Sequence, residues 1–274
     1  MPELPEVETI ARGVNERVQG DRIVQAWFGS HKEPFKTAPA QQAKGLEGRV
    51  ILTVQRIGKH IVCTLGTMDG AADAQWIVHL GMTGRLLVTT PDGPVALHTH
   101  ARLSLASGRE IRFVDPRRFG RLEFRDLLRK EGFKGPGKEP LTIDAEEFVG
   151  LFRGRRLAIK AALLNQTLLA GVGNIYADES LFRAGIRPRR MAGRLTEAEL
   201  ERLRLALREV LKHAIRMGGS SVSDYVDADG VKGFFQLEHC VYLRTGLPCR
   251  QCGTSIRRIL LAGRGTHFCP RCQR

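Results

Sequence analysis

The chain has 274 residues, and its 43 lysines and arginines exceed its 29 acidic residues by a formal net charge of +14. With 42% hydrophobic and 26% charged residues, its composition is that of a globular protein and excludes a disordered basic tail. The length fits one or two domains. The charge surplus favours a polyanionic partner, either nucleic acid or an anionic membrane face.

The hydropathy pattern and the first residues argue against membrane insertion and export. No stretch approaches the ~18 consecutive apolar residues of a membrane helix. The N-terminal residues 1–8 are acidic and interrupted by proline, the reverse of a secretory signal. We therefore expect a soluble cytoplasmic protein without a membrane partner, whose six cysteines do not form a disulfide framework.

The N-terminal residues also predict a helix. Pro5 fits the first helical turn, where its missing N–H breaks no bond, and Glu6 and Glu8 suit the positive end of a helix. Apolar residues then recur at helical spacing as far as Val18, and Gly20-Asp21 ends the pattern.

From Ile23 to about Phe124 the pattern changes to short β-like runs, separated by turn signals such as Asp69-Gly70 and Ser107-Gly108. This region predicts a β-rich domain, a sandwich or a barrel, behind the leading helix. The clearest runs are residues 49–54, 60–65, 76–80 and 85–88.

The second half of the chain is predicted to be helical. Residues 129–140 are charged, glycine-rich and bounded by proline, which is typical of an interdomain linker. The clearest helix begins at the capping box Thr196–Glu199 and stops at Gly218-Gly219. We therefore expect an α+β multidomain protein, divided into a helix plus β-sandwich at 1–128, a linker at 129–140, a helical domain at 141–239 and a cysteine module at 240–274.

Four of the six cysteines form two pairs, Cys249-x2-Cys252 and Cys269-x2-Cys272, with 16 residues between them. Each pair can direct two thiolates at one tetrahedral ion, and the spacer can form a hairpin with strands at 257–261 and 266–268 and a tip at 263–265. Structural zinc contributes roughly 10–16 kcal/mol of apparent binding free energy, which so short a module needs. The spacing predicts one structural zinc ion and fits a redox dithiol or incidental thiols less well.

The same module is strongly basic, because residues 249–274 hold six arginines and no acidic residue. A zinc ribbon that only stabilised the fold does not need so one-sided a surface, so nucleic-acid contact is the favoured role. The two other cysteines, Cys63 and Cys240, lie alone in apolar runs and are expected in the core.

Several separated motifs occur together in the chain, in order, from residue 2 to residue 272. They are residues 2–8 (PELPEVE), 58–60 (GKH), 79–84 (HLGMTG), 115–120 (DPRRFG), 164–166 (LNQ), 171–177 (GVGNIYA) and the four paired cysteines. With this set the sequence resembles the formamidopyrimidine-DNA glycosylase family. The resemblance implies a β-sandwich behind a catalytic helix, then a helix-two-turn-helix domain and a zinc hairpin.

The resemblance places the chemistry at the N-terminus. Removal of Met1 would expose a secondary amine at Pro2, and an α-amino group, with a reference pKa of ~7.7–8.0 against ~10.4 for lysine, offers more neutral nucleophile near pH 7. The amine would attack the sugar C1′, expel the damaged base and leave an iminium (Schiff base). The iminium acidifies the C2′ proton and opens strand scission by β,δ-elimination.

Four further residues receive catalytic roles from the resemblance. Glu3 is the family's acid, placed to protonate the sugar ring oxygen or the leaving group, and Glu6 is a second carboxylate that supports it. Lys59, in a glycine-led turn, would contact the phosphate beside the lesion, and Arg264, at the hairpin tip, would aid δ-elimination. The alternative is that the glutamates only start a helix and the two cations are solvated surface.

The remaining implied roles concern DNA. An extruded nucleotide leaves a void, and Met82, Arg117 and Phe119 match the family's wedge, cytosine-binding guanidinium and stacking aromatic, although Met82 alone also fits a core position. Residues 220–233 resemble the family's lesion-recognition loop, with an ordinary surface loop as the alternative. The side chains expected to hold phosphates are His98, Arg117, Arg155, Lys160 and Asn174.

The resemblance thus implies a monomeric bacterial enzyme of base-excision repair at the nucleoid. It would remove oxidised purines (8-oxoguanine and formamidopyrimidines) from double-stranded DNA and cleave abasic sites. The sister endonuclease VIII type prefers oxidised pyrimidines, and Leu4 together with the three void-filling residues favours the purine branch. A zinc-ribbon protein that only binds DNA is a third possibility, but it needs neither Pro2, Glu3 and Glu6 nor Lys59.

Overall fold

The computed structural model describes residues 1–30, 34–221 and 225–274. The chain forms two compact units, and the first combines Met1–Gly135 with the later segment Gly218–Gly233. The second contains Pro136–Met217 and Phe234–Arg274, so the expected helical and cysteine parts share one unit. The boundaries expected at residues 128, 140 and 239 stay predictions. Across the described ranges, no helix combines the length and apolarity needed to cross a membrane.

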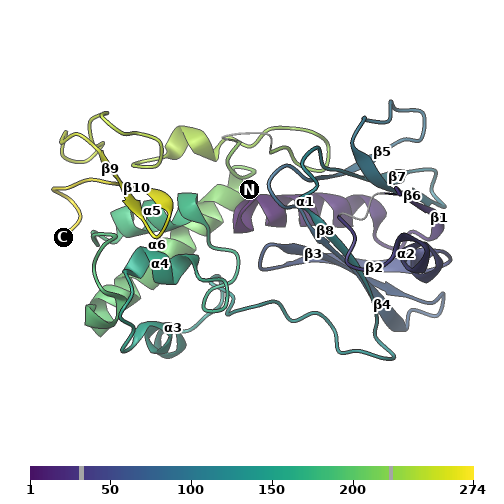
Figure 1. The fold of residues 1–274 in the computed structure, drawn as a ribbon, viewed down its shortest axis with the longest axis horizontal. Coiled ribbons are helices and arrows are strands. Elements are labelled where there is room, and N and C mark those ends of the chain that lie inside the picture. The colour runs from purple at the N-terminus through teal and green to yellow at the C-terminus, as the bar shows by residue number, and fades with distance from the viewer. Residues whose placement is uncertain (31–33, 222–224) are drawn as a thin grey trace. The chain divides into compact units, whose positions relative to one another are not determined.

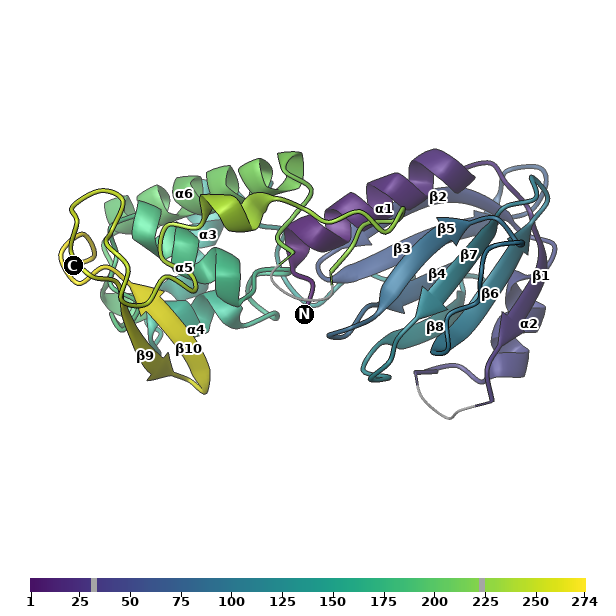
Figure 2. The ribbon, with the colours of Figure 1, turned by 90° about the horizontal axis from the view of Figure 1, so that it is seen from above.

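The first unit begins with helix α1 (Leu4–Val18) and continues into two four-stranded antiparallel sheets (Figures 1 and 2). Its other elements are β1 (Ile23–Phe28), α2 (Pro39–Leu46), β2 (Val50–Ile57), β3 (His60–Gly66), β4 (Ala72–His79), β5 (Arg85–Thr89), β6 (Thr99–Leu105), β7 (Glu110–Val114) and β8 (Arg121–Asp126). One sheet has the strand order β1-β6-β7-β5 and the other the order β2-β3-β4-β8.

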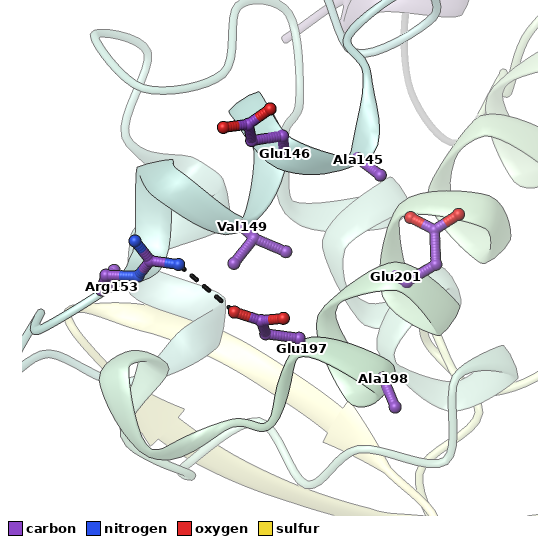
Figure 3. A pocket seen from close by; sticks show the side chains of 7 residues that line it. All are labelled: Ala145, Glu146, Val149, Arg153, Glu197, Ala198 and Glu201. Carbon is purple, nitrogen blue, oxygen red and sulfur yellow. Dashed lines mark hydrogen bonds and ion pairs between the residues drawn. The ribbon is translucent and has the colours of Figure 1, made fainter.

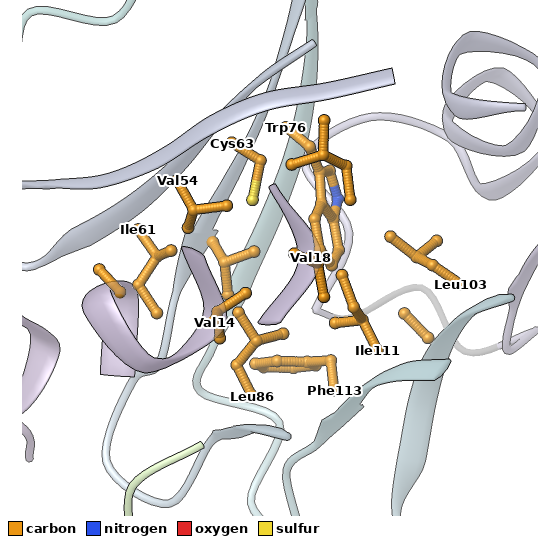
Figure 4. Close-up of a cluster of buried hydrophobic side chains, with 14 of the residues drawn as sticks. Val14, Val18, Val54, Ile61, Cys63, Trp76, Leu86, Leu103, Ile111 and Phe113 are labelled. Carbon is orange, nitrogen blue, oxygen red and sulfur yellow. The ribbon is translucent and has the colours of Figure 1, made fainter. Parts of the chain in front are cut away.

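The hydrophobic core of this unit lies between the two sheets and under α1. Trp76 of one sheet and Phe113 of the other belong to the same buried cluster as Val14 of α1 (Figure 4). Cys63 is part of this cluster, as expected, and its burial raises the pKa of its thiol to about 12. The predicted leading helix and β-sandwich are therefore confirmed.

The second unit is helical and ends in a hairpin. Its elements are α3 (Ala145–Phe152), α4 (Ile159–Leu164), α5 (Asn174–Arg183), the 3-10 turn η1 (Ala192–Arg194), α6 (Glu197–Arg216), the 3-10 turn η2 (Phe235–Glu238), β9 (Arg257–Leu261) and β10 (Arg264–Phe268). The predicted capping box starts α6, since Thr196 Oγ1 accepts the Glu199 N–H at 3.2 Å and the Glu199 carboxylate accepts the Thr196 N–H at 2.9 Å. Cys240 is only partly buried, beside the cysteine cluster.

Candidate functional site

The start of α1 holds two buried carboxylates. Glu3 occupies the N-cap position, and Glu6 lies one turn further on. Glu6 Oε2 accepts the Glu3 N–H at 2.8 Å, while Glu6 Oε1 accepts the Ser220 N–H, also at 2.8 Å. Negative charge is favoured at the N-terminal end of a helix, which stabilises both carboxylates there. Pro2, directly before Glu3 in the chain, is also buried. Met1 precedes Pro2, so the predicted amine requires removal of Met1.

The described residues of the segment Gly218–Gly233 belong to the first unit, and Ser220 contacts the helix start through Glu6. Gly219 has a φ of +81°, and a Cβ added there would lie 2.9 Å from Glu6 Oε1, so only glycine fits without displacing that carboxylate. Tyr225 is buried in the sandwich core, and its hydroxyl donates to the Gly218 carbonyl at 3.0 Å. Burial, reinforced by the charge of Glu6, raises the pKa of Tyr225, which keeps the hydroxyl a donor.

This segment was expected to be a lesion-recognition loop at 220–233, and residues 222–224 of it lie outside the described residues. Its described remainder is anchored at both ends. Ala228 joins the sandwich core and its carbonyl accepts the Val88 N–H at 3.1 Å, and the Gly233 N–H donates to Ser221 Oγ at 2.9 Å. These contacts hold the described part of the segment against the sandwich core and beside Glu6.

Lys59 lies in the tight turn between β2 and β3, directly after Gly58, whose φ is +61°. Only 7% of Lys59 is exposed, so it is not a solvated surface lysine. The turn is tied to α1, because Arg56 pairs with Glu8 at 2.8 Å and donates to the Gly58 carbonyl at 3.2 Å. The first unit therefore fixes the Lys59 turn relative to the helix that carries Glu3.

Two neighbouring histidines continue from this turn. The rings of His60 and His79 lie 4.8 Å apart between their centroids. Burial lowers the pKa of His79 to about 4, and the positive groups His60, Lys59 and Arg121 lower it further. His79 is thus neutral near pH 7, and its Nδ1 accepts the Gly81 N–H at 3.1 Å, which sets the start of the turn that carries Met82.

The expected void-filling residues come from two turns that are locked together. Asp115 is fully buried, and its carboxylate accepts Thr83 Oγ1–H at 2.6 Å and the Gly120 N–H at 2.7 Å. A Cβ added at Gly81 would lie 2.4 Å from the carbonyl carbon of Phe119, so the turns touch backbone to backbone. Sequence reasoning gave Asp115 no role of its own, although it lies in the quoted motif.

On this locked pair of turns, large apolar side chains face solvent. Met82 is 43% exposed and Phe119 is 46% exposed, and the Arg117 guanidinium lies 4.6 Å from the centre of the Phe119 ring. Exposed apolar residues of this size, held on rigid turns, are typical of a binding surface. His98 is also exposed, and its carbonyl accepts the Asp115 N–H at 2.9 Å, so the first unit brings all four predicted residues onto linked turns.

In the second unit, the hairpin displays Arg264. Its strands pair from Arg264–Leu261 to Phe268–Arg257. Ala262 and Gly263 form the tip, with φ values of 48° and 72°, as in a two-residue type I′ turn. The tip predicted at 263–265 is therefore one residue too late, and Arg264 is the exposed first residue of β10.

Lys160 was predicted to contact a phosphate, but the structure buries its side chain. It is 0% exposed, and its Nζ lies 2.7 Å from Asp178 Oδ1, 3.0 Å from the Gly265 carbonyl oxygen and 2.9 Å from Thr266 Oγ1. A direct phosphate contact does not agree with this burial. Lys160 instead joins α4 to the strand that begins with Arg264, and the buried Asp178, which no sequence signal marked, completes the pair.

Asn174 and Arg155 are the other predicted phosphate ligands of this unit. The Asn174 side-chain amide donates to the same Gly265 carbonyl at 3.0 Å, so Gly265 receives two side chains from the helices behind it. Arg155 is half-buried, and its Nε donates to the Leu151 carbonyl at 2.5 Å. Asn174 therefore lies directly behind Arg264.

The four paired cysteines meet at the end of the hairpin. Their sulfur atoms all lie within 4.8 Å of one another, with Cys249 and Cys272 at 3.8 Å and Cys252 and Cys269 at 3.5 Å. A tetrahedral zinc with Zn–S bonds of ~2.3 Å requires sulfur separations of ~3.8 Å. The four thiolates are therefore positioned to bind one zinc ion, as predicted.

A separate hollow of about 360 Å³ between α3 and α6 has the opposite charge (Figure 3). Glu146, Glu197 and Glu201 surround Val149; Arg153 pairs with Glu197 at 3.2 Å, and Arg204 pairs with Glu201 at 2.6 Å. None of the predicted site residues lines it. With three carboxylates and two paired arginines, the hollow has no excess of positive charge and lacks the basic character expected of a nucleic-acid surface.

Three family models match successive parts of the chain. They are the formamidopyrimidine-DNA glycosylase N-terminal domain at residues 1–122, the formamidopyrimidine-DNA glycosylase H2TH domain at residues 136–226 and the zinc finger found in FPG and IleRS at residues 246–274. The chain belongs to the formamidopyrimidine-DNA glycosylase family. It is 45% identical over 274 residues to the formamidopyrimidine-DNA glycosylase of Solibacter usitatus, with 100% of both chains covered. It is 47% identical over 288 residues to that of Thermus thermophilus, covering 100% of this chain and 98% of the relative.

Solved structures of the formamidopyrimidine-DNA glycosylase family have the same fold. A Lactococcus lactis FPG mutant in complex with a Fapy-dG containing DNA has a TM-score of 0.87 at 36% identity, with 100% of both chains covered. The MutM (Fpg) protein of Thermus thermophilus has a TM-score of 0.85 at 42% identity, covering 99% of this chain and 98% of the other. This family of DNA-repair glycosylases thus accounts for both units and the zinc hairpin.

Proposed function

We propose that this protein is a bifunctional DNA glycosylase and AP lyase that removes oxidised purines, such as 8-oxoguanine and formamidopyrimidines, from duplex DNA. The observation that carries the proposal is the start of α1, where buried Glu3 and Glu6 adjoin buried Pro2. A helix start needs no such burial of carboxylates. Similar proteins have been solved in complex with DNA that contains Fapy-dG or carbocyclic 8-oxo-G.

In this mechanism the Pro2 amine, freed by removal of Met1, attacks C1′ and the bond to the damaged base breaks. Glu3 donates a proton to the sugar ring oxygen or to the leaving base. The amine loses its proton, and the C1′–O4′ bond then breaks to leave the iminium. Loss of the C2′ proton to solvent turns the iminium into an enamine, whose electron pair expels the 3′ phosphate as the β-leaving group. Glu6 holds the Glu3 backbone at 2.8 Å and so fixes the acid relative to the amine.

Cations of both units serve the elimination steps. Lys59, restrained in its turn by Arg56, contacts the phosphate beside the lesion. Arg264, the exposed first residue of β10, assists δ-elimination. Guanidinium and ammonium groups suit this task because they neutralise the negative charge of a phosphate through charge-assisted hydrogen bonds.

The remaining surface residues hold the bent duplex. Met82, Arg117 and Phe119 enter the void left by the extruded nucleotide, where Arg117 pairs with the orphaned cytosine and Phe119 stacks. His98, Arg155 and Asn174 bind phosphates. When zinc is bound to the four cysteines, it supplies the fixed hairpin base on which Arg264 depends. We further propose that the enzyme acts as a monomer.

Borohydride trapping tests the function. The protein with Met1 removed is mixed with duplexes that carry 8-oxoguanine or thymine glycol, and the covalent protein–DNA adducts are counted. The proposal expects adducts, with more on 8-oxoguanine. A preference for thymine glycol would assign the protein to the endonuclease VIII branch. Absence of adducts with both duplexes would refute the enzyme and leave a protein that only binds DNA.

The nucleophile is tested separately with Pro2→Gly. This variant is expected to lose base excision and trapping while its affinity for DNA is unchanged. Pro5→Ala, which changes a proline of the same helical turn, is the matched control and should retain excision. An active Pro2→Gly enzyme would contradict the proposed role.

A further inference from the structure

A second basic feature of the helical unit lies outside all the motifs that led to the proposed function. Four arginines line a hollow of about 700 Å³, together with Ala158 and the exposed Met191. Among the residues that the structure describes, no acidic side chain lines the hollow. The four are Arg156, Arg189, Arg190 and Arg194.

The arginines are mounted on two backbone segments that are bonded to each other. The Ile159 N–H donates to the Arg190 carbonyl at 2.7 Å, and the Ala192 N–H donates to the Leu157 carbonyl at 2.9 Å. A Cβ added at Gly193 would lie 2.7 Å from the Arg155 nitrogen, so the two segments are in contact along their length. A hollow built on paired backbones keeps its shape without a ligand.

Only one of the four positive charges is neutralised. Arg190 grips Glu199 through two contacts of 2.5 and 3.0 Å, and these hydrogen bonds lower the pKa of Glu199 to about 2. Across residues 1–30, 34–221 and 225–274, neither Arg156 nor Arg189 nor Arg194 has an ion-pair partner. Three like charges around one hollow repel one another, and an anion placed among them relieves that repulsion.

We propose that this hollow binds the phosphodiester backbone of the DNA duplex that flanks the lesion. The inference rests on the proposed function, because it assumes that duplex DNA is the partner of this unit. Arg156 directly follows Arg155, an expected phosphate ligand, so the hollow continues the same basic surface. Guanidinium groups bind phosphate oxygens through paired hydrogen bonds, and sequence-independent backbone contacts position a protein on DNA without reading bases.

The salt dependence of binding measures such contacts. Each neutralised phosphate contributes about 0.9 to the slope of log affinity against log salt concentration. Loss of about two phosphate contacts therefore lowers the magnitude of the slope by about 1.8, and it shrinks the affinity lost between 50 and 200 mM salt by about 12-fold. These values hold only for a duplex long enough to reach the hollow.

The test uses the full zinc-loaded protein with the substitutions Arg156→Ala, Arg189→Ala and Arg194→Ala combined. Binding to a short and a long duplex with the same abasic analogue is measured over a range of salt. The variant should show the smaller slope on the long duplex only. Its trapping by borohydride on a short duplex that carries 8-oxoguanine should equal that of the parent. The matched control combines Lys44→Ala, Lys212→Ala and Arg216→Ala, which removes the same charge from exposed positions elsewhere and should leave the slope nearer the parent value.

Two results would overturn the inference. The first is a slope on the long duplex that the variant and its control lower equally, since this would show only the general field of the protein. The second is an unchanged slope on the long duplex. If inorganic pyrophosphate then raises the thermal stability of the parent but not of the variant, the hollow binds a small free anion instead. Absence of trapping by the parent protein would instead refute the proposed function and leave the salt test on long undamaged DNA valid.

Discussion

The buried pair of Lys160 and Asp178 is predicted to control both the stability of the helical unit and the placement of Arg264. Both side chains of the pair are essentially inaccessible. Asp178 Oδ2 also accepts the His267 N–H at 2.8 Å. Asp178→Asn removes the negative charge and leaves a buried ammonium unpaired, which typically costs about 3–5 kcal/mol. The Arg264 strand then loses part of its support, so strand scission should fall more than base excision.

The double variant Asp178→Asn with Lys160→Met separates the charge effect from simple loss of packing. It removes both charges but also the Lys160 bonds to the Gly265 carbonyl at 3.0 Å and to Thr266 Oγ1 at 2.9 Å. Because the double variant leaves no buried charge of this pair without its partner, it should cost less than the sum of the two single variants, with a coupling energy of about 2 kcal/mol or more.

Urea unfolding measured by far-UV circular dichroism, at constant zinc, follows the helical unit. The two tryptophans, Trp27 and Trp76, lie in the first unit, so their fluorescence is an internal control that should not change. A cost below about 1 kcal/mol for Asp178→Asn, or strictly additive single effects, would refute the view that a buried charge pair holds this strand.

Three further predictions concern other parts of the molecule. Gly81→Ala should lower the stability of the first unit by about 2–4 kcal/mol in tryptophan-monitored unfolding, because φ is +63° and the new Cβ meets the Phe119 backbone at 2.4 Å. Gly108→Ala, where φ is +84° and the new Cβ enters open space, should cost about 1 kcal/mol. Equal costs of the two variants would show that the contact with Phe119 is unimportant. Chelation of zinc should weaken DNA binding while tryptophan fluorescence is unchanged, and a zinc-free protein of undiminished affinity would contradict this. The pKa of His79 is about 4 in the folded chain against an ordinary value of 6.5, so the unfolded chain binds the proton first as the pH falls. The contribution of neutral His79 to the free energy of unfolding is therefore complete above pH 6.5 and should fall by up to about 3 kcal/mol as the pH drops towards 4. His79→Gln should flatten this part of the stability profile, and an identical profile would exclude His79 as the cause.

The parts of the fold that the sequence predicted depend on local signals. The capping box at Thr196 and the helical apolar spacing up to Val18 specify helices through contacts within a few residues. The paired cysteines predict the zinc site because their spacing along the chain lets each pair direct two thiolates at one tetrahedral ion. A motif such as residues 115–120 shows where a site lies in the sequence but not which hydrogen bonds form within it. The central role of Asp115 was therefore visible only in the structure.

The parts that could not be predicted depend on packing between distant segments. Lys160 was assigned to a phosphate by the family resemblance, and nothing in the local sequence shows that Asp178 is buried beside it. Residues 218–233 follow the long helix α6, and their sequence does not reveal that Tyr225 enters the core of the first unit. In both cases the deciding partner is supplied by tertiary structure.

Tertiary partners also decide how much of the net charge of +14 can act on DNA. At long range DNA responds to the whole sum, but at contact it meets only the cations that lack a protein partner. Arg112 is buried and donates to the Gly93 and Pro94 carbonyls at 3.0 and 2.9 Å, and Arg204 is buried against the Ile143 carbonyl at 3.2 Å. Such arginines raise the count without offering a phosphate contact. The salt slope of binding should therefore follow the exposed Arg264 of the hairpin and the arginines of the hollow. It should change little when a buried arginine is replaced in a variant that stays folded.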